Sequence, residues 1–319
     1  MAAAAVAAAA AASATSSFPS AHRERTRTRS ARPSLVSLHS GALLRVLRDG
    51  LRTNLGPGFD FLGCAVADAS LSLGDTVTAT LDPTLPPSTV SIACPHLAAR
   101  LSKDSLHNCA GAVDALFGSR LERDDLILAS LESEKAVSGF HVDNITPTIL
   151  GGFVLVRSYE PFHMVPLASP PGLCLHLVLL TPDFEAPTSK MRAALPKEVG
   201  VQQHVRNLSQ AAALVAGVLQ GGAGLIGSAM SLDGIVEPNR APLIPGMVAV
   251  KAAVLQARGC TISGAGSTAV AVIDGEEKRD EVGGMMVGAF WSTGKLKATA
   301  IVVQLDRHGA RVMATTALG

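Results

Sequence analysis

The sequence predicts a two-domain α+β protein, and three observations lead to this fold class. The chain has 319 residues, which is enough for one large or two ordinary domains. Helical and strand patterns alternate along it without the regular βαβ spacing of a doubly wound parallel sheet. The stretch Ser169–Gly172 (SPPG) interrupts these patterns. We therefore place a domain boundary near residue 165, with an N-terminal domain over 43–165 and a C-terminal domain over 166–319.

The N-terminal domain begins with a strand pattern and continues with a helix. Val, Thr and Leu alternate over Ala65–Leu81, which predicts two paired strands with a turn near Gly74. A helix is predicted over Asp124–Ser138, because acidic residues occupy its first turn and Gly139 follows its end. The apolar run Gly151–Arg157 predicts a further strand.

The C-terminal domain mixes both kinds of element. Its strands are predicted at Leu173–Thr181, Thr261–Ser263, Ala269–Ile273 and Leu296–Leu305, and its helices at Arg206–Leu219 and Ile244–Gln256. The longest uncharged stretch, Asn207–Leu232, is rich in Ala, Gly and Ser and is broken at Gly221–Gly222. This composition predicts two short helices around a glycine break and no membrane span.

The composition excludes several classes of function. The 27 Lys and Arg residues nearly balance the 26 Asp and Glu residues, so nothing indicates a nucleic-acid or strongly acidic partner. The five cysteines are odd in number and never in CxxC spacing. This argues against a disulfide framework or a zinc site and for a reducing compartment, and we expect each cysteine to be a buried, inert thiol.

Residues 1–42 differ in kind from the rest of the chain. Met1–Ala14 is nearly pure alanine, serines and five arginines follow, and Glu24 is the only acidic residue before Asp49. Arg-rich, Ser-rich and acid-poor composition is typical of an organelle transit peptide, which would be disordered and outside the fold. The alternatives are a secretory signal, whose basic residues would precede the apolar run, and a disordered basic tail.

The most informative stretch is Thr53–Gly63 (TNLGPGFDFLG). Its glycines and proline predict a sharp turn that exposes the backbone, since Gly tolerates positive φ and Pro stiffens the chain. Asn54 and Asp60 flank this turn, where their side chains can bind a polar small molecule. A purely structural turn with flanking polar residues is the alternative.

Further polar stretches suit the binding of a small molecule. His141–Asn144 (HVDN) is expected in a loop before Pro147, with its polar side chains directed into a cleft, unless they serve only as a cap and turn. Arg192 and Arg240 each lie between prolines, and Arg is the natural planar clamp for a carboxylate, although a lone Arg is often just solvated. Gly259–Thr268 (GCTISGAGST) predicts a tight glycine turn between two strands.

These motifs together resemble those of homoserine kinases, within the superfamily of galactokinase, homoserine kinase, mevalonate kinase and phosphomevalonate kinase, and the plant enzymes most of all. The resemblance implies a small-molecule kinase fold with an N-terminal domain like ribosomal protein S5 and a ferredoxin-like C-terminal domain. It also implies transfer of the γ-phosphoryl group of ATP to the side-chain hydroxyl of L-homoserine, with Mg²⁺ as cofactor, in threonine biosynthesis. The implied location is the chloroplast stroma, whereas the composition of residues 1–42 alone leaves mitochondrial import as an alternative. No membrane or nucleic-acid partner is implied, and a homodimer is an allowed assembly.

The resemblance implies roles for the substrate-binding side chains. Asn54, Asp60, His141 and Asn144 would lie against the amino acid, with Asn144 at the hydroxyl that is phosphorylated. Asp60 would also orient or polarise reacting groups, or else bind the substrate amino group. Arg192 and Arg240 would hold the α-carboxylate between the two domains.

The resemblance assigns a second set of residues to the nucleotide and its metal. Glu134 would help to hold Mg²⁺, and the nearby Glu132 is the alternative. The glycine turn, represented by Ser263, Gly264 and Gly266, would lie beside the phosphates and the first motif. Ser267 stands where the family usually has proline, which should only loosen the turn.

The chain departs from the family at the phosphates of ATP. Superfamily kinases hold them with a Gly-Leu-Gly-Ser-Ser type of loop, whose backbone N–H groups and helix N-terminus bind the anion. No such segment lies between Phe61 and Glu134. His107–Gly111 resembles the start of the helix before that loop, Ala112–Gly118 resembles the end of the helix after it, and the two are joined directly.

We therefore expect a shortened N-terminal domain, an intact substrate half and impaired phosphoryl transfer, since transfer depends on preorganised donors around the phosphates. The alternatives are a catalytically inactive paralogue that binds homoserine or a partner subunit, and a faulty gene model of an active kinase.

Overall fold

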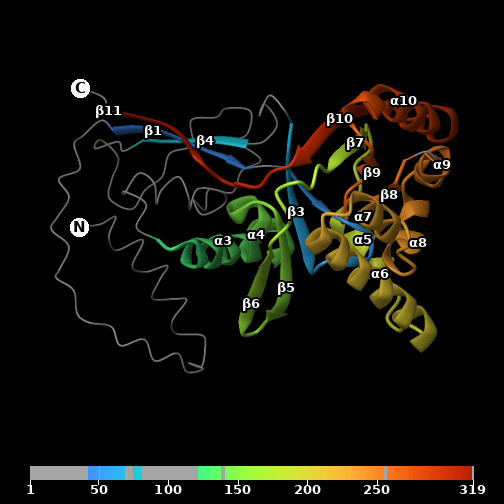
Figure 1. Cartoon of the computed structure of the whole chain (residues 1–319), viewed down its shortest axis with the longest axis horizontal. Coiled ribbons are helices and arrows are strands. Elements are labelled where there is room, and N and C mark those ends of the chain that lie inside the picture. The colour runs from blue at the N-terminus through green and yellow to red at the C-terminus, as the bar shows by residue number, and fades with distance from the viewer. Residues whose placement is uncertain are drawn as a thin grey trace. The chain divides into compact units, whose positions relative to one another are not determined.

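The structure, a computed structural model, describes residues 42–49, 51–68, 75–80, 121–137, 141–254 and 257–317 (Figure 1). Residues 1–41 of the predicted transit peptide, the predicted junction at the missing loop, Cys94 and Cys109 lie outside these residues. Contacts divide the chain into two compact units. The first unit comprises residues 1–48, 76–140 and 311–319, and the second comprises residues 49–75 and 141–310.

The described part of the first unit contains a small sheet and one helix. The sheet has the strand order β11-β1-β4, with β1 at Ala42–Asp49, β4 at Asp75–Thr80 and β11 at Val312–Ala317. The helix α3 spans Arg123–Val137 and carries Asp124 and Asp125 in its first turn, where carboxylates stabilise a helix N-terminus. The predicted helix at this position is therefore confirmed.

The second unit is built on an eight-stranded sheet whose main order is β6-β5-β3-β10-β7-β9-β8, with β2 paired to β3. All of the strand pairs given for this sheet are antiparallel. Its strands are β2 (Leu51–Asn54), β3 (Leu62–Ala67), β5 (Phe153–Tyr159), β6 (Phe162–Leu167), β7 (His176–Pro182), β8 (Gly259–Ile262), β9 (Ala269–Ile273) and β10 (Ala298–Leu305).

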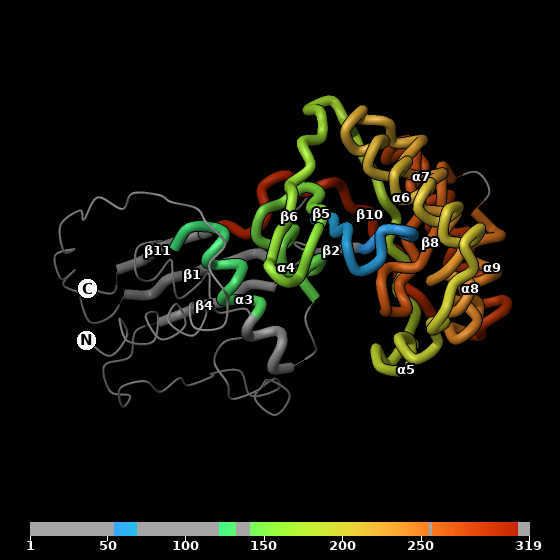
Figure 2. The backbone as a smooth tube through the Cα atoms, turned by 90° about the horizontal axis from the view of Figure 1, so that it is seen from below, coloured from blue at the N-terminus to red at the C-terminus, as the bar shows by residue number. Residues whose placement is uncertain are grey.

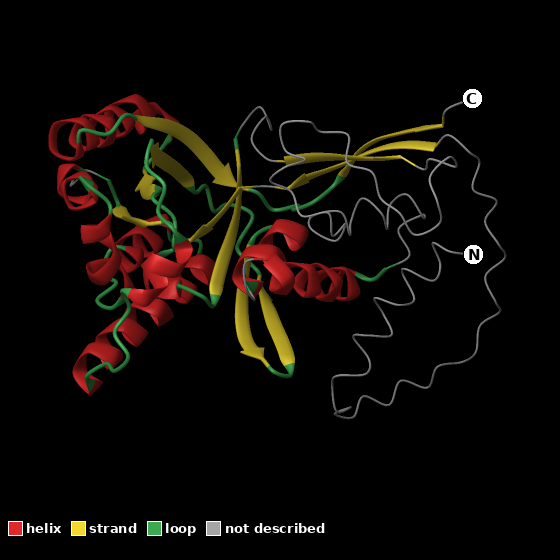
Figure 3. Ribbon diagram, turned by 180° about the vertical axis from the view of Figure 1, so that it is seen from behind, coloured by secondary structure: helices red, strands yellow, loops and turns green. Residues whose placement is uncertain are grey.

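Helices and short turns complete this unit. The α-helices are α4 (Val142–Leu150), α5 (Thr188–Ala193), α6 (Val201–Gln220), α7 (Ala223–Met230), α8 (Val236–Arg240), α9 (Met247–Ala253) and α10 (Arg279–Ala289). The short helical turns are η1 (Gly56–Gly58), η2 (Ala241–Leu243), η3 (Glu276–Lys278) and η4 (Phe290–Gly294). Figure 2 shows α6 to α9 next to one another, and Figure 3 shows β5 and β6 as a two-stranded hairpin.

Strands β7 and β9 are buried on both faces, which explains their unbroken apolar sequences. Leu177 of β7 belongs to a core cluster that includes Leu214 of α6, whereas its neighbour Val178 belongs to a second cluster with Met286 of α10. Successive side chains of a strand point to opposite faces, so helices cover both sides of the sheet at this point. Mixed helices and antiparallel strands confirm the predicted α+β class.

Most of the predicted elements of the second unit are present. Gly221, at φ +73°, ends α6 in the left-handed conformation, and α7 begins at Ala223, so the two predicted helices around a glycine break are confirmed. Among the described residues, no helix combines the length and the apolar character that crossing a membrane requires.

Four predictions need correction or remain open. The strands predicted to pair within Ala65–Leu81 are not partners, because β3 pairs with β2, β5 and β10 while β4 belongs to the other sheet. His141–Asn144 is not in a loop, because α4 begins directly after His141 and contains Pro147. Cys174 is exposed, whereas Cys64 and Cys260 are buried as predicted. The domain boundary near residue 165 falls within β6 and stays a prediction.

Close packing of β3 against α4 gives a test of the fold. A Cβ on Gly63 would lie 1.9 Å from the carbonyl oxygen of Asp143, and backbone cannot give way as a flexible side chain can. We expect Gly63→Ala to lower the free energy of unfolding by about 3 kcal/mol in urea denaturation. Gly284→Ala in α10 is the matched control, because its Cβ would meet nothing within 4 Å. It should raise stability by about 0.5–1 kcal/mol, and equal effects of the two changes would contradict the packing described.

Candidate active site

The Thr53–Gly63 motif connects β2 to β3 through the turn η1 and two left-handed residues. Gly56 has φ +50°, and a Cβ there would lie 2.1 Å from the carbonyl oxygen of Met230, so no other residue fits. Asp60 has φ +66°, which is uncommon for a residue with a side chain. The Tyr159 hydroxyl donates to the Asp60 carbonyl oxygen at 2.6 Å and holds this conformation. The predicted sharp turn is therefore confirmed.

The Asp60 side chain forms a two-pronged ion pair with Arg192. Arg192 Nη1 donates to Oδ2 at 3.1 Å and Nη2 donates to Oδ1 at 2.9 Å. Both side chains are more than one-third exposed, so solvent weakens the attraction. The structure thus brings together two predicted site residues, and each provides the other's hydrogen-bonding partner and counter-charge.

Arg240 differs from Arg192 because it is fully buried. Its Nε donates to the Met191 carbonyl oxygen at 3.0 Å and its Nη1 donates to the Gly264 carbonyl oxygen at 3.0 Å. Burial lowers the pKa of Arg240 to about 10, with Asp60 acting against this shift and Arg192 adding to it. The guanidinium therefore keeps its charge at neutral pH. Its Nη2 is buried and donates to no described group.

Phe59 lies next to both guanidinium groups, and the sequence argument did not assign it a role. The Arg240 Cζ atom is 4.0 Å from the centre of the ring and the Arg192 Cζ atom is 5.5 Å from it. The electron-rich faces of an aromatic ring attract cations, most strongly where water is excluded. Phe59 therefore allows two positive charges to face one small region. Its position directly before Asp60 in the motif was the available signal.

Helix α4 contributes a buried carboxylate that the sequence argument also missed. Asp143 is only 2% exposed, and its Oδ2 accepts a short hydrogen bond from Asn54 Nδ2. Its Oδ1 is buried with no partner among the described residues. Burial raises the pKa of Asp143, and the Asn54 bond opposes this shift. An unpaired buried carboxylate oxygen indicates a missing donor, and the HVDN motif was the signal for it.

The neighbours of Asp143 are the predicted site residues His141 and Asn144. His141 precedes α4 at its N-terminus, and Asn144 lies in the first turn of the helix. Both are half-buried. The backbone N–H of Asn144 donates to the His141 carbonyl oxygen at 3.1 Å. The structure therefore places His141, Asp143 and Asn144 at one helix end, with Asn54 against it.

The glycine turn between β8 and β9 lies beside the first motif, because Leu55 and Ser263 form an isolated antiparallel bridge. Gly264 has φ +56°, and a Cβ there would lie 2.9 Å from Asn54 Oδ1. The N–H groups of Ser263 and Gly266 are bonded within the turn, to the carbonyl oxygens of Thr268 and Ser263. The contact of Ser263, Gly264 and Gly266 with nucleotide stays a prediction, whereas the Gly264 carbonyl oxygen clearly supports Arg240.

The predicted metal ligand, Glu134, is in the last turns of α3, but the description of the structure does not extend to its side chain. Within the described ranges, no group of three or more His, Cys, Asp or Glu side chains could hold a metal ion. The Mg²⁺ role of Glu134 therefore stays a prediction, and no reaction step is derived from it.

Comparison with known proteins identifies the family. The chain is 50% identical over 306 residues to the homoserine kinase of Arabidopsis thaliana, covering 82% of this chain and 82% of the relative. The chain belongs to the homoserine kinase family. It is 37% identical over 205 residues to the homoserine kinase of Chloroherpeton thalassium, covering 63% of each chain. Residues 211–292 match the family model for the C-terminal part of GHMP kinases.

The fold agrees with this family. The crystal structure of homoserine kinase from Cytophaga hutchinsonii superimposes with a TM-score of 0.70 at 29% identity, covering 88% of this chain and 100% of that one. The predicted resemblance and the GHMP kinase fold are therefore confirmed. Homoserine kinases are ATP-dependent phosphotransferases. All of the site residues described above except Glu134 lie in the second unit of this chain.

The unpaired Asp143 gives a test with a definite sign. Because its pKa is raised in the folded protein, the folded state holds a proton more tightly than the unfolded state does. Its contribution to stability is therefore lost as the pH rises from the ordinary Asp pKa through the raised one. We expect Asp143→Asn to increase the free energy of unfolding by about 1–2 kcal/mol at pH 7, and by less towards pH 4.

Urea denaturation at several pH values measures this difference. Asp183→Asn is the matched control, because Asp183 is exposed and should change stability by less than about 0.5 kcal/mol. An Asp143→Asn variant that is less stable at pH 7 would show that a donor already satisfies this carboxylate.

Proposed function

We propose that this chain binds L-homoserine in the site around Arg240 and Asp143, and that its phosphoryl transfer from ATP is impaired. One observation carries the substrate half. The site holds a buried donor and a buried acceptor that have no partner among the described residues, Arg240 Nη2 and Asp143 Oδ1. An amino acid carries a carboxylate and an ammonium group that would satisfy both atoms.

The two arginines have different parts in this proposal. Arg240 is held in place before the substrate arrives, and its free Nη2 would donate to the substrate carboxylate. Arg192 is paired with Asp60, so the substrate carboxylate would share its fork with Asp60 or displace it. Hydrogen bonds to charged groups contribute roughly 1.5–3 kcal/mol each, which makes Arg240 the main anchor. Asp60 would then position Arg192 during catalysis and would not act as a general base.

Helix α4 would bind the other end of the substrate. The ammonium group would donate to Asp143 Oδ1, with Asn54 holding the second carboxylate oxygen and His141 at the edge. Asn144 follows Asp143 in the first turn and would contact the hydroxyl that is phosphorylated. This arrangement selects an amino acid with a side-chain hydroxyl over a hydroxy acid such as mevalonate, since mevalonate has a carboxylate but no ammonium group.

The nucleotide half is where the chain would fall short. Phosphoryl transfer depends on preorganised donors, and loss of one donor typically costs about 10²–10³ in rate. The alignment with the Arabidopsis homoserine kinase is 306 positions long but includes only 82% of this 319-residue chain. Some of its positions are therefore gaps in this chain, which supports an internal deletion. In this proposal Glu134 would help to hold Mg²⁺, and Ser263, Gly264 and Gly266 would lie beside the phosphates.

The cellular setting of the proposal follows from the N-terminus. Residues 1–42 would direct import into the chloroplast stroma, and the plant relative supports this location. A reaction product there would be O-phospho-L-homoserine for threonine biosynthesis. A homodimer would be an allowed assembly, with no membrane or nucleic-acid partner.

A second candidate is a homoserine-binding protein without kinase activity. The complementary pair Arg240 and Asp143 together with the missing phosphate loop favour it, because binding needs the first feature alone. Such a protein would act through a partner subunit or by sequestering homoserine. The turnover of the isolated chain distinguishes the two candidates.

The proposal is tested by measuring binding and turnover on the same full chain. We expect isothermal titration calorimetry to detect L-homoserine binding, and a kinase assay with Mg-ATP to yield O-phosphohomoserine at least about 100-fold more slowly than the Arabidopsis enzyme. Turnover equal to that enzyme would show that another segment holds the phosphates. No heat of binding from a folded chain would reject the substrate half.

The anchor role of Arg240 predicts a specific loss. Arg240→Lys keeps the positive charge but removes the planar fork, so we expect homoserine affinity to fall by about 10- to 100-fold. Arg279→Lys is the matched control, since Arg279 is about half exposed in ion pairs outside the site. Calorimetric titration measures both variants, and an unchanged affinity in Arg240→Lys would remove Arg240 from the site.

A further inference from the structure

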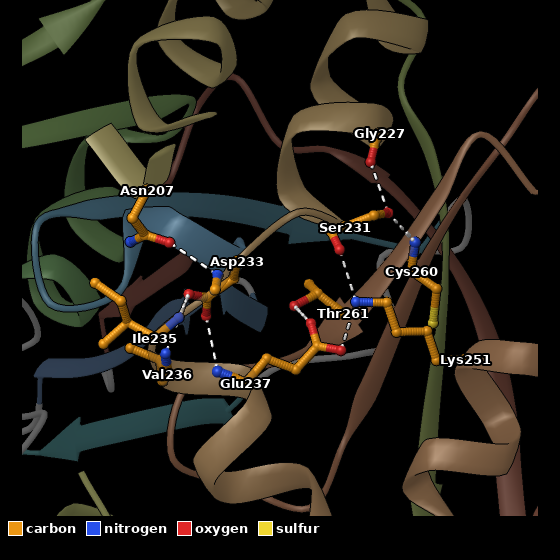
Figure 4. A network of polar contacts seen from close by, with 11 residues as sticks. Asn207, Gly227, Ser231, Asp233, Ile235, Val236, Glu237, Lys251, Cys260 and Thr261 are labelled. Atoms are coloured by element: carbon orange, nitrogen blue, oxygen red, sulfur yellow. Dashed lines mark hydrogen bonds and ion pairs between the residues drawn. The ribbon is translucent and has the colours of Figure 1, made fainter. Parts of the chain in front are cut away.

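A second polar cluster is formed around Glu237, on the same short helix as Arg240, and nothing in the proposed reaction uses it. The Glu237 cluster consists of Glu237, Lys251, Thr261 and Ser231 (Figure 4). Lys251 Nζ donates to Glu237 Oε1 at 2.6 Å, and Thr261 Oγ1 donates to Glu237 Oε2 at 2.7 Å. Lys251 Nζ also donates to the Ser231 carbonyl oxygen at 2.7 Å. Every oxygen of the buried Glu237 carboxylate is therefore occupied.

The Glu237 cluster connects three elements around the short helix α8. Glu237 is on α8, Lys251 is on α9 and Thr261 is on β8. Asp233 fixes the start of α8, because its carboxylate accepts from the N–H groups of Ile235, Val236 and Glu237. Helix α8 has five residues, and Arg240 is its last. A helix this short cannot hold its own orientation, so these contacts set it.

Both ends of the Arg240–Gly264 hydrogen bond depend on this cluster. Glu237 lies three residues before Arg240, on the same side of α8. Thr261, its partner, lies three residues before Gly264, whose carbonyl oxygen accepts from Arg240 Nη1. The bond between Glu237 and Thr261 therefore fixes the donor and the acceptor elements relative to each other. A shift of α8 along β8 would move the free Nη2 with it.

Stability alone is a weak reason for a buried ion pair at this place. Removing two charges from water opposes their attraction, and well-packed apolar side chains often serve as well or better. The pKa of Glu237 shows both effects: burial raises it, and the contacts with Lys251 and Thr261 lower it. The directional bonds of a carboxylate do what apolar packing cannot, since they fix orientation as well as distance.

The hollow beside α8 is better understood as the solvent-facing side of this cluster than as a ligand site. It has a volume of about 670 Å³, and its lining includes Ser228, Lys251, Val254 and Arg258. It contains none of the predicted site residues. Lys251 is bonded to Glu237 and Ser231, and Arg258 is paired with Asp274, so the cations that line it are already matched.

We propose that Glu237 is a positioning residue, which holds α8 through Lys251 and Thr261 so that the free Nη2 of Arg240 meets the carboxylate of the substrate. The inference rests on the proposed function for the identity of that carboxylate. The position of Arg240 is also a property of the ligand-free protein, so the role of Glu237 can be tested without substrate.

The first measurement follows Arg240 without any ligand. The Nε–H group of Arg240 is buried and hydrogen-bonded, so it should give a distinct cross-peak in a ¹H–¹⁵N NMR spectrum, assigned by its loss in Arg240→Lys. We expect Glu237→Gln to shift or broaden this cross-peak, because Gln can accept from Thr261 but carries no charge for Lys251. Glu281→Gln is the matched control, since it removes the exposed ion pair with Lys278 by the same substitution. Thr261→Val serves as a second, uncharged variant should Glu237→Gln fail to fold.

The second measurement tests whether the effect reaches the carboxylate of the substrate. We expect Glu237→Gln to weaken L-homoserine binding by about tenfold, as displacement of one charged hydrogen bond would. Binding of L-homoserine amide, which has no carboxylate, should change by less than about twofold. A general loss of stability would weaken both ligands alike, whereas misplacement of Arg240 affects the carboxylate ligand alone.

The outcomes separate the two proposals. An unchanged Arg240 cross-peak in Glu237→Gln and Thr261→Val overturns the positioning role, and so does equal weakening of homoserine and its amide. A displaced cross-peak in a protein that binds no homoserine supports the positioning of Arg240 and rejects the proposed function.

Discussion

A charged guanidinium buried in the second unit determines how the rest of the site is arranged. Taking Arg240 out of water costs several kcal/mol, and the protein recovers this through two carbonyl acceptors at roughly 1.5–3 kcal/mol each and an aromatic ring at up to about 2 kcal/mol. Each of these partners comes from a different segment, namely the end of α5, the glycine turn and the first motif. One side chain therefore fixes three segments that are far apart in the sequence.

The same constraint is the basis for the proposed survival of the substrate half in a chain without the phosphate loop. The Arg240 partners, the Asp60–Arg192 pair and the Asn54–Asp143 bond all lie in the second unit, which has its own core on both faces of β7 and β9. Each of these contacts joins residues of the second unit alone. Transfer of a phosphoryl group, in contrast, needs donors around the phosphates that these contacts cannot supply. Binding and catalysis are therefore expected to separate in this chain.

The sequence predicted the parts of the molecule that depend on local pattern or on a motif. The helix over Asp124–Ser138, the glycine break at Gly221 and the sharp turn at Thr53–Gly63 follow from capping, glycine and proline rules, and all three are present. Strand partners could not be obtained in this way, because pairing of β3 with β5 and β10 depends on contacts between segments far apart in the chain. The alternation over Ala65–Leu81 is compatible with either partner.

The site was predicted as a set of residue types but not as an arrangement. The two arginines came from their proline-bounded motifs, but burial separates them, since Arg240 is fully buried and Arg192 is paired with Asp60 near the surface. Phe59 and Asp143 were missed for the same physical reason. Their importance arises from what surrounds them in space, two cations near one ring and an unsatisfied oxygen, and neither is visible in a local pattern.

The account depends most on where an amino acid binds, and a crystal structure of the chain soaked with L-homoserine measures this directly. The account predicts a carboxylate oxygen within hydrogen-bonding distance of Arg240 Nη2 and the ammonium group within the same reach of Asp143 Oδ1. A homoserine molecule that leaves both atoms unpaired, or that binds elsewhere, would contradict the central claim.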